Sequence, residues 1–344
     1  MSTKSLRAAL FLLLFAVPAG AQWQTIEPGG ETLCADGSPF RFFVHPGDPA
    51  RLLVEFEGGG GCWSAETCAM EIYTRRITTD PALAERLGLL VGIYDRSHPE
   101  NPFREWTHVY IPYCTGDLHW GNATRTYVGA VGPYTVEHRG AQNAAAALRW
   151  ASENVPAPAQ VTVTGCSAGG YGSILWAPAL ISRYSGASVV HLSDSAAGVV
   201  PPGFFATVLA SWDVSAAWPK DIPPLALENL DASRLTLADV YSGIAGRYPL
   251  ATFSQFNALT DSTQLYFYGL TRGAPATEAD WSAQMQASIA ALKAANPNFA
   301  AYIAPGSQHC IINTPGFYTT TVNGVRLVDW VNRLLSTRSP ASVP

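Results

Sequence analysis

The chain has 344 residues, of which 48% are hydrophobic and 14% charged, and its formal net charge is −5. This composition predicts a folded chain with a large buried core and excludes intrinsic disorder. The acidic balance and the lack of any run of like charges argue against a nucleic-acid partner and against binding to an anionic membrane.

The first residues have the pattern of a secretory signal peptide. Lys4 and Arg7 precede an apolar stretch over 8–17, and small residues end at Ala21. We therefore predict a signal peptide over 1–21, cleaved after Ala21. The apolar stretch is too short to span a bilayer and no later segment is long enough, so we expect no integral membrane segment. The mature chain, 22–344, is expected to be a single exported domain, extracellular or periplasmic.

Strands and helices alternate through the first two thirds of the chain. In chain order we predict a strand at 51–57, a helix at 80–90, a strand at 106–112, a helix at 139–154, and strands at 160–164 and 187–193. Alternation of this kind predicts an α/β fold with a mostly parallel central sheet and helices on both faces.

The remaining third begins with an irregular segment. Residues 201–248 are rich in Pro, Trp and Phe, and we interpret them as an insertion that forms part of the substrate surface. A strand at 250–256, a helix at 277–294 and a strand at 299–304 are predicted to follow. The small, proline-containing tail, 336–344, is expected to be frayed.

A Gly-x-Ser-x-Gly sequence directly follows the strand predicted at 160–164. It runs from Gly165 to Gly169 with Ser167 at its centre, and this pattern is typical of a nucleophile elbow. In such an elbow the serine hydroxyl is exposed at a tight strand-to-helix turn, and the N–H of the next residue, Ala168, can face an oxyanion. The alternative is a purely conformational turn. We predict Ser167 as a catalytic nucleophile.

A serine nucleophile needs a histidine base that is oriented by an acid. His309 comes directly after the last predicted strand, in the expected chain order, although a surface histidine in a Gly-Ser turn is the alternative. Two residues compete as the acid, because Asp261 follows the strand at 250–256 and Asp194 ends the strand at 187–193. We prefer Asp261, with a helix-capping role as its alternative. Asp194 would then be a second acid that orders the loops beneath the pocket.

Four glycines, 58–61, come straight after the strand at 51–57. Their peptide N–H groups can approach a substrate oxygen without side-chain obstruction, so we predict Gly59 and Gly60 as the other donors of an oxyanion hole. A phosphate-binding loop is the rival interpretation, but no Lys-Ser or Lys-Thr follows.

Polar and aromatic side chains follow the strand at 106–112. Asp117, His119 and Trp120 either line the pocket or form a hydrogen-bonded support for the glycine loop, and we favour the supporting role for Asp117.

The cysteines are even in number, which in an oxidising compartment favours three disulfides over free thiols. Their spacing alone does not fix the pairs, although the second and third are close enough to close a local loop. No Cys-x-x-Cys or His-x-x-x-His spacing is present, so we expect no metal and no other cofactor. The cysteines are Cys34, Cys62, Cys68, Cys114, Cys166 and Cys310.

Taken together and in this order, several of these segments resemble the pectin acetylesterase and Notum family. They are Cys34-Ala-Asp-Gly-Ser-Pro, Phe56-Glu-Gly-Gly-Gly-Gly-Cys-Trp, Pro112-Tyr-Cys-Thr-Gly-Asp, Gly165-Cys-Ser-Ala-Gly-Gly, Leu192-Ser-Asp-Ser and Gln308-His-Cys. The resemblance implies an α/β-hydrolase fold and metal-independent hydrolysis of carboxylic esters.

By position, the resemblance implies a triad of Ser167, Asp261 and His309, with Gly59, Gly60 and Ala168 in the oxyanion hole. It also implies the disulfides Cys34–Cys114 and Cys62–Cys68, and leaves Cys166–Cys310 as a pair beside the triad.

The resemblance bears on the substrate as well. Notum has an aromatic residue in its glycine loop and a large lipid pocket, whereas this chain has Gly60 and Gly61 and a shorter insertion. We therefore expect a short acyl group, such as acetate on a small ester or a plant polysaccharide like pectin. The alternatives are a lipase or polyester depolymerase with the same triad, and a non-catalytic protein that binds carbohydrate or another ligand.

Overall fold

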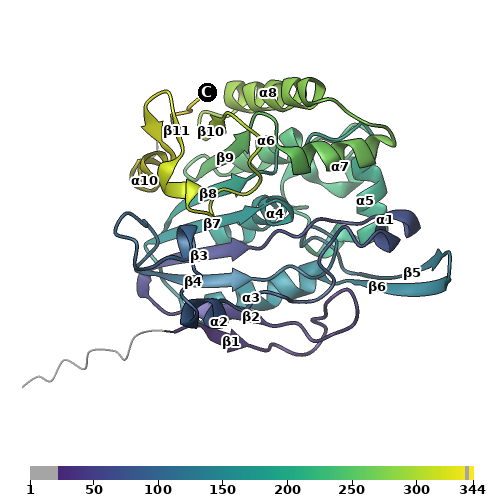
Figure 1. The fold of residues 1–344 in the computed structure, drawn as a ribbon, viewed down its shortest axis with the longest axis horizontal. Coiled ribbons are helices and arrows are strands. Elements are labelled where there is room, and N and C mark those ends of the chain that lie inside the picture. The colour runs from purple at the N-terminus through teal and green to yellow at the C-terminus, as the bar shows by residue number, and fades with distance from the viewer. Residues whose placement is uncertain (1–21, 338–340) are drawn as a thin grey trace, which may run out of the picture.

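The computed structural model describes residues 22–337 and 341–344, so the signal peptide expected over 1–21 lies outside the described part. Figure 1 shows a central sheet with helices packed around it and a two-stranded hairpin that extends away from the body. Within these limits, no helix is long and apolar enough to cross a membrane.

Eight strands form one sheet in the order β1-β2-β4-β3-β7-β8-β9-β10. From β4 to β10 the neighbours are parallel, whereas β1 and β2 make antiparallel pairs at one edge. The predicted fold class, a mostly parallel sheet in an α/β chain, is confirmed. The strands are β1 (Gln24–Ile26), β2 (Phe42–His45), β3 (Asp48–Phe56), β4 (Trp106–Ile111), β7 (Gln160–Cys166), β8 (Ser188–Asp194), β9 (Thr252–Ala258) and β10 (Phe299–Ala304).

Helices cover both faces of the sheet, and the strand side chains show this directly. Leu52 and Val54 of β3 pack in a core cluster with residues of α3, α4 and α8, while Leu53 packs in a second cluster with residues of α9 and α10. Neighbours in a strand point to opposite faces, so both faces are buried. The helices are α1 (Ala65–Ala69), α2 (Pro81–Arg86), α3 (Gly140–Asn154), α4 (Ala168–Arg183), α5 (Phe204–Trp212), α6 (Leu237–Arg247), α7 (Ser262–Arg272), α8 (Glu278–Ala295), α9 (Gly316–Thr319) and α10 (Leu327–Ser336).

The predicted insertion, 201–248, divides into two parts with different surroundings. Three short 3₁₀ helices connect α5 and α6: η2 (Val214–Ala216), η3 (Pro223–Leu225) and η4 (Leu227–Asn229). Helix α5 lines the cavity described below. Helix α6 instead buries Val240 and Ile244 in the main core, so within the insertion it is the first part that lies at the cavity.

Several elements were not predicted from the sequence. A hairpin of β5 (Ala123–Gly129) and β6 (Gly132–His138) projects from the body in Figure 1 and exposes Val128 and Val131 near its turn. Its alternating pattern of half-buried and exposed residues gives no continuous apolar signal. Smaller additions are η1 (Gly92–Tyr94) and the pair β11 (Thr321–Val322) and β12 (Val325–Arg326).

The expected fraying of the tail is wrong for its last residues. Val343 is buried and pairs with β10, because its N–H donates to the Ala301 carbonyl at 2.8 Å and its carbonyl accepts from the Ile303 N–H at 2.9 Å. The Ala341 carbonyl accepts from the Trp330 indole at 2.7 Å. These contacts hold residues 341–344 against the edge of the sheet.

Deleting residues 341–344 removes two backbone–backbone hydrogen bonds, the carbonyl that accepts from the Trp330 indole, and one buried apolar side chain. We expect the free energy of unfolding to fall by about 2–4 kcal/mol, measured by urea denaturation. Val131→Ala is the control, because Val131 is fully exposed and the change should cost less than about 0.5 kcal/mol. Identical unfolding midpoints for the deletion and the parent would contradict the proposed role of the tail.

Candidate active site

Ser167 lies at the turn between β7 and α4, in a backbone conformation that is unusual for a serine. Its φ of 54° and ψ of −124° place it in a region that non-glycine residues rarely occupy. The turn is fixed on both sides: the Ser167 N–H donates to the Asp194 carbonyl at 2.9 Å, and the Ser167 carbonyl accepts from the Gly170 N–H at 2.9 Å. Strain of this kind at a serine is typical of a functional site.

Three glycines let the turn at Ser167 lie directly against the end of β3. A Cβ on Gly169 or on Gly165 would collide with the Phe56 carbonyl, and a Cβ on Gly58 would collide with the Cys166 carbonyl and the Ser167 side chain. The glycine loop and the elbow therefore touch through their backbones alone.

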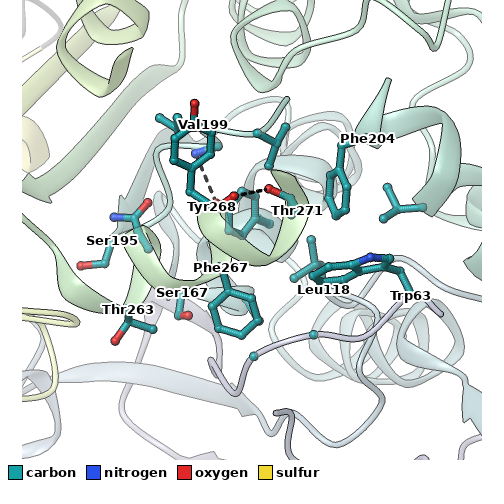
Figure 2. Close-up of a pocket in the computed structure, with 18 of the residues that line it drawn as sticks. Trp63, Leu118, Ser167, Ser195, Val199, Phe204, Thr263, Phe267, Tyr268 and Thr271 are labelled. Carbon is teal, nitrogen blue, oxygen red and sulfur yellow. Dashed lines mark hydrogen bonds between the residues drawn. The ribbon is translucent and has the colours of Figure 1, made fainter. Parts of the chain in front are cut away.

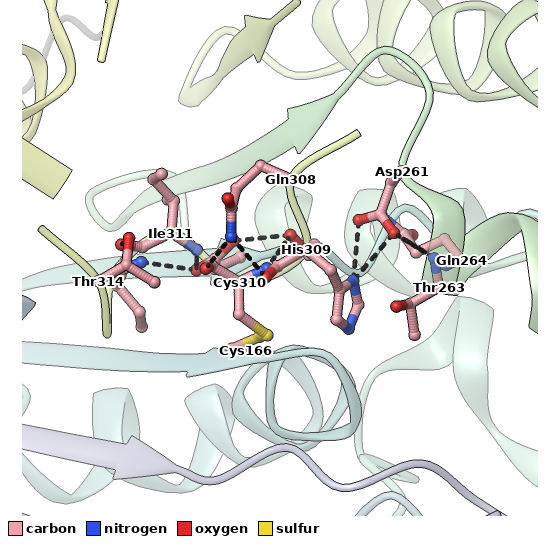
Figure 3. The surroundings of a disulfide bond; sticks show 12 residues. Cys166, Asp261, Thr263, Gln264, Gln308, His309, Cys310, Ile311 and Thr314 are labelled. Carbon is pink, nitrogen blue, oxygen red and sulfur yellow. Dashed lines mark hydrogen bonds and ion pairs between the residues drawn. A yellow bond between two sulfur atoms is a disulfide. The ribbon is translucent and has the colours of Figure 1, made fainter. Parts of the chain in front are cut away.

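Asp261 and His309 meet across two loops at the carboxyl edge of the sheet, as Figure 3 shows. The His309 Nδ1 lies 3.0 Å from Asp261 Oδ1 and 2.9 Å from Asp261 Oδ2. The carboxylate is completely buried and also caps α7, since its Oδ1 accepts from the N–H groups of Thr263 and Gln264. Capping and orientation of the histidine are thus performed by one side chain rather than being alternatives.

Asp194 makes no hydrogen bond to the His309 imidazole in the described structure. It binds instead the backbone of the loop that follows His309. Its Oδ2 accepts from the backbone N–H groups of Ile311 and Ile312 at 2.7 and 2.9 Å, and its Oδ1 accepts from the Ser195 hydroxyl at 2.8 Å. Burial raises the pKa of this carboxyl to about 6, although the hydrogen bonds act in the opposite direction. Our prediction that the second acid orders the loops describes this geometry.

Beyond Gly58, the part of the glycine loop that lines the cavity is Gly60 and Gly61 rather than Gly59. Gly60 and Gly61 line the same cavity as Ser167 and Ala168. Gly59 packs towards Thr74 and Tyr113, and its carbonyl accepts from the Thr74 N–H at 2.8 Å. The oxyanion-hole donors remain a prediction, with Gly60 and Ala168 facing the cavity.

Behind the glycine loop, Asp117 and His119 form the support that the sequence suggested. His119 Nε2 lies 2.9 Å from the Glu57 carbonyl, and Asp117 accepts from the N–H groups of His119 and Gly140 at 3.1 and 2.8 Å. Burial lowers the pKa of His119 to about 4, so at neutral pH its uncharged ring can donate one proton to that carbonyl. Trp120 differs from these two because it lines the cavity, while its indole donates to the Tyr171 carbonyl at 3.0 Å.

The structure joins the cysteines in the same three pairs as the family resemblance implies: Cys34–Cys114, Cys62–Cys68 and Cys166–Cys310. The third pair links the residue before Ser167 to the residue after His309 (Figure 3). Nucleophile and histidine loops are therefore connected covalently as well as through Asp194.

A cavity of about 90 Å³ opens between these residues, and its walls are mostly aromatic and aliphatic. Figure 2 shows Ser167 beside Phe267, with Trp63, Leu118 and Phe204 grouped further along the wall. Trp63 and Phe204 pack edge to face at 4.9 Å, which joins the glycine loop to α5. Ser167 and His309 are two of the few polar groups in this lining.

Two residues that hold the site together, Gln264 and Ser195, were not predicted from the sequence. Gln264 donates its side-chain amide to Asp261 Oδ2 at 3.0 Å, and the Ser195 hydroxyl accepts from the Cys310 N–H at 3.0 Å. Ser195 stands next to Asp194 in the Leu-Ser-Asp-Ser segment, and Gln264 comes three residues after Asp261, where a capping residue's partner would stand. These two positions in the sequence were the features from which the contacts could have been predicted.

Replacing Asp194 by Asn should destabilise the protein, because two buried backbone N–H groups would lose a charged acceptor. We expect the free energy of unfolding to fall by about 2–4 kcal/mol, measured by urea denaturation at pH 7. Asp221→Asn makes the same change of charge at an exposed position and should have little effect. An Asp194→Asn protein as stable as this control would refute the role assigned to the carboxylate.

The chain matches the family model described as pectinacetylesterase over residues 26–205, more than half of its length. Pectin acetylesterase 4 of Arabidopsis thaliana is 31% identical over 93 residues, and palmitoleoyl-protein carboxylesterase notum2 of Xenopus laevis is 29% identical over 102 residues. These segments cover 26% and 28% of this chain, but only 22% and 20% of the two relatives.

The structural similarity to known proteins covers nearly the whole chain. The crystal structure of the Wnt deacylase Notum from Drosophila superposes with a TM-score of 0.68, covering 93% of this chain and 94% of that one at 18% identity. A second crystal form of the same protein gives a TM-score of 0.65. The family model matches the region that contains the glycine loop, the elbow and Asp194. Because this match covers more than half of the chain, the chain belongs to the pectinacetylesterase family.

Proposed function

We propose that the protein is a secreted serine carboxylesterase that removes short acyl groups, acetyl above all, from ester substrates. The observation that carries the proposal is the contact of His309 Nδ1 with both carboxylate oxygens of the buried Asp261, because His309 lines the same cavity as the strained Ser167. Membership of the pectinacetylesterase family and the names of the two curated relatives support the same class of reaction.

In the proposed mechanism, the Asp261 carboxylate accepts a hydrogen bond from the Nδ1–H of His309, so that Nε2 is unprotonated and free to act as a base. Nε2 takes the proton of Ser167 as its oxygen attacks the ester carbonyl. Backbone N–H groups of Gly60 and Ala168 stabilise the oxyanion, and His309 then returns the proton to the leaving alcohol. Water attacks the acyl-enzyme in the same way and regenerates Ser167.

A short acyl group suits the size of the cavity. Its volume of about 90 Å³ is well below the roughly 300–1,000 Å³ of pockets that enclose drug-sized ligands. The apolar walls fit an acyl chain rather than a sugar, so the alcohol part of the substrate would lie outside. A small ester or an acetylated polysaccharide such as pectin meets this description.

Secretion is part of the proposal. The signal-peptide pattern over 1–21 and the three disulfides both fit an oxidising compartment outside the cytosol.

Ser167→Ala and His309→Ala should each lower kcat/KM for p-nitrophenyl acetate by about 10⁴-fold or more, and the double variant should be little worse than either single one. Asp261→Asn should cost about 10³- to 10⁴-fold, because it favours the wrong histidine tautomer. Asp221→Asn is the control. If Ser167→Ala hydrolyses the ester at the parental rate, Ser167 is not the nucleophile and the proposed mechanism is wrong. If a fluorophosphonate leaves Ser167 of the parent unlabelled, a non-catalytic binding role is favoured instead.

The apolar lining also favours a second candidate function, a lipase or polyester depolymerase, and the acyl chain length separates the two. We expect the parent to prefer p-nitrophenyl acetate and butyrate to the octanoate. Phe267 lines the cavity next to Ser167, so Phe267→Ala should raise the octanoate-to-acetate ratio of kcat/KM by about tenfold.

Tyr266→Ala is the matched control for that change, because Tyr266 is the preceding residue in α7 but is largely exposed and outside the cavity lining. A parent that prefers the octanoate, or that releases monomer from polyester film faster than acetate from acetylated pectin or xylan, would replace the short-acyl assignment by the second candidate.

A further inference from the structure

Gln264 lies in the first turn of α7 with its side chain buried beside the Asp261 carboxylate. Its Nε2 donates to Asp261 Oδ2 at 3.0 Å and to Asn257 Oδ1 at 3.1 Å, and its Oε1 accepts from the Ala197 N–H at 2.8 Å. One side chain thus joins the acid, the end of β9 and the loop that follows β8.

These partners determine which way round the amide lies. A primary amide has two N–H donors and one carbonyl acceptor, and here both donors face oxygen atoms while the acceptor faces a backbone N–H. The reversed amide would place its oxygen against the Asp261 carboxylate and its NH₂ against another donor. Gln264 therefore presents a hydrogen-bond donor to Asp261 in a fixed orientation.

The two oxygens of Asp261 are held differently. Oδ1 accepts from the backbone N–H groups of Thr263 and Gln264, which belong to the helix that the residue caps, and it also lies 3.0 Å from His309 Nδ1. For Oδ2, the partners seen among the described residues are His309 and the side chain of Gln264. Without the Gln264 side chain, that oxygen would keep only its contact with the imidazole in a fully buried site.

We propose that Gln264 is a positioning residue for catalysis, which fixes the Asp261 carboxylate so that it holds the His309 imidazole in the productive orientation. This inference rests on the proposed esterase function. The role differs from general packing because it passes through one acceptor atom, Asp261 Oδ2.

Two further amide side chains, those of Asn257 and Gln255, connect Gln264 to β9. Asn257 accepts from Gln264 and donates from its own Nδ2 to Gln255 Oε1 at 3.1 Å, and both residues are buried in β9. Breaking either of these two buried hydrogen bonds would leave a polar atom without a partner, so they hold the Gln264 amide in place. Through Gln264, these amides connect the Asp261 carboxylate to β9.

The test is a double-mutant cycle between Gln264 and Asp261, with kcat and KM measured for p-nitrophenyl acetate. Gln264→Met keeps the length of the side chain and removes the amide. We expect kcat to fall by about 10- to 100-fold, the loss expected for a hydrogen bond to a charged group, while KM changes by less than about threefold. In the Asp261→Asn background, the same substitution should change kcat by less than about twofold, because its target is already lost.

Gln286→Met is the control, since Gln286 is exposed in α8 and bonds only locally to Ser282. If Gln264→Met does not fold, Gln264→Asn replaces it, because this variant keeps an amide in the buried site but is one methylene shorter, which withdraws the donor from Asp261 Oδ2. The same loss of kcat and the same absence of effect beside Asp261→Asn are then expected.

Three results would overturn the inference while leaving the esterase proposal intact. They are an unchanged kcat in the Gln264 variant, an equal loss in the presence and absence of Asp261→Asn, and a rise in KM alone, which would mean that Gln264 contacts the substrate from the cavity wall. A fully active Ser167→Ala protein would instead refute the proposed serine mechanism, so the two failures are distinguishable.

Discussion

The contact on which the site depends is the one between two stretches of bare backbone, the end of β3 and the turn at Ser167. Gly165 and Gly169 meet the Phe56 carbonyl, and Gly58 meets Cys166, at separations that leave no space for a Cβ. Because no side chains intervene, the glycine loop and the turn at Ser167 lie closer together than ordinary side-chain packing allows. The glycines of the Gly-x-Ser-x-Gly sequence are thus needed as much for this approach as for the strained angles of the serine.

Residue Asp194, at the end of β8, connects the other two parts of the site. Its carbonyl accepts the N–H of Ser167, and its carboxylate accepts the N–H groups of Ile311 and Ile312 just beyond His309. The strand that lies between β7 and β9 in the sheet therefore fixes both the elbow and the histidine loop. Asp261 and Gln264, at the end of β9 and the start of α7, complete the arrangement from the far side.

The fold class and most of the site were predictable from sequence, since strands, loops and helices alternate and the Gly-x-Ser-x-Gly turn and His309 occur in a recognisable order. The choice between Asp194 and Asp261 was not determined by the residues, because both stand at the end of a parallel strand and differ only in the direction of their side chains. Two features could not be predicted, because they depend on tertiary contacts that no local pattern encodes. One is the contact of Gln264 with Asp261, and the other is that Gly61, rather than the predicted Gly59, lines the cavity with Gly60. The β5–β6 hairpin was missed because only one of its faces is partly covered.

The Cys166–Cys310 bond has a further consequence for the unfolded chain. Its cysteines are 144 positions apart, against 80 and 6 for the other two bonds. In the chain-entropy description, a cross-link that closes so long a loop removes disorder from the denatured ensemble worth about 5 kcal/mol, more than a short loop can. The covalent link that sets the catalytic loops side by side is therefore also the one that most restricts the conformations open to the denatured protein.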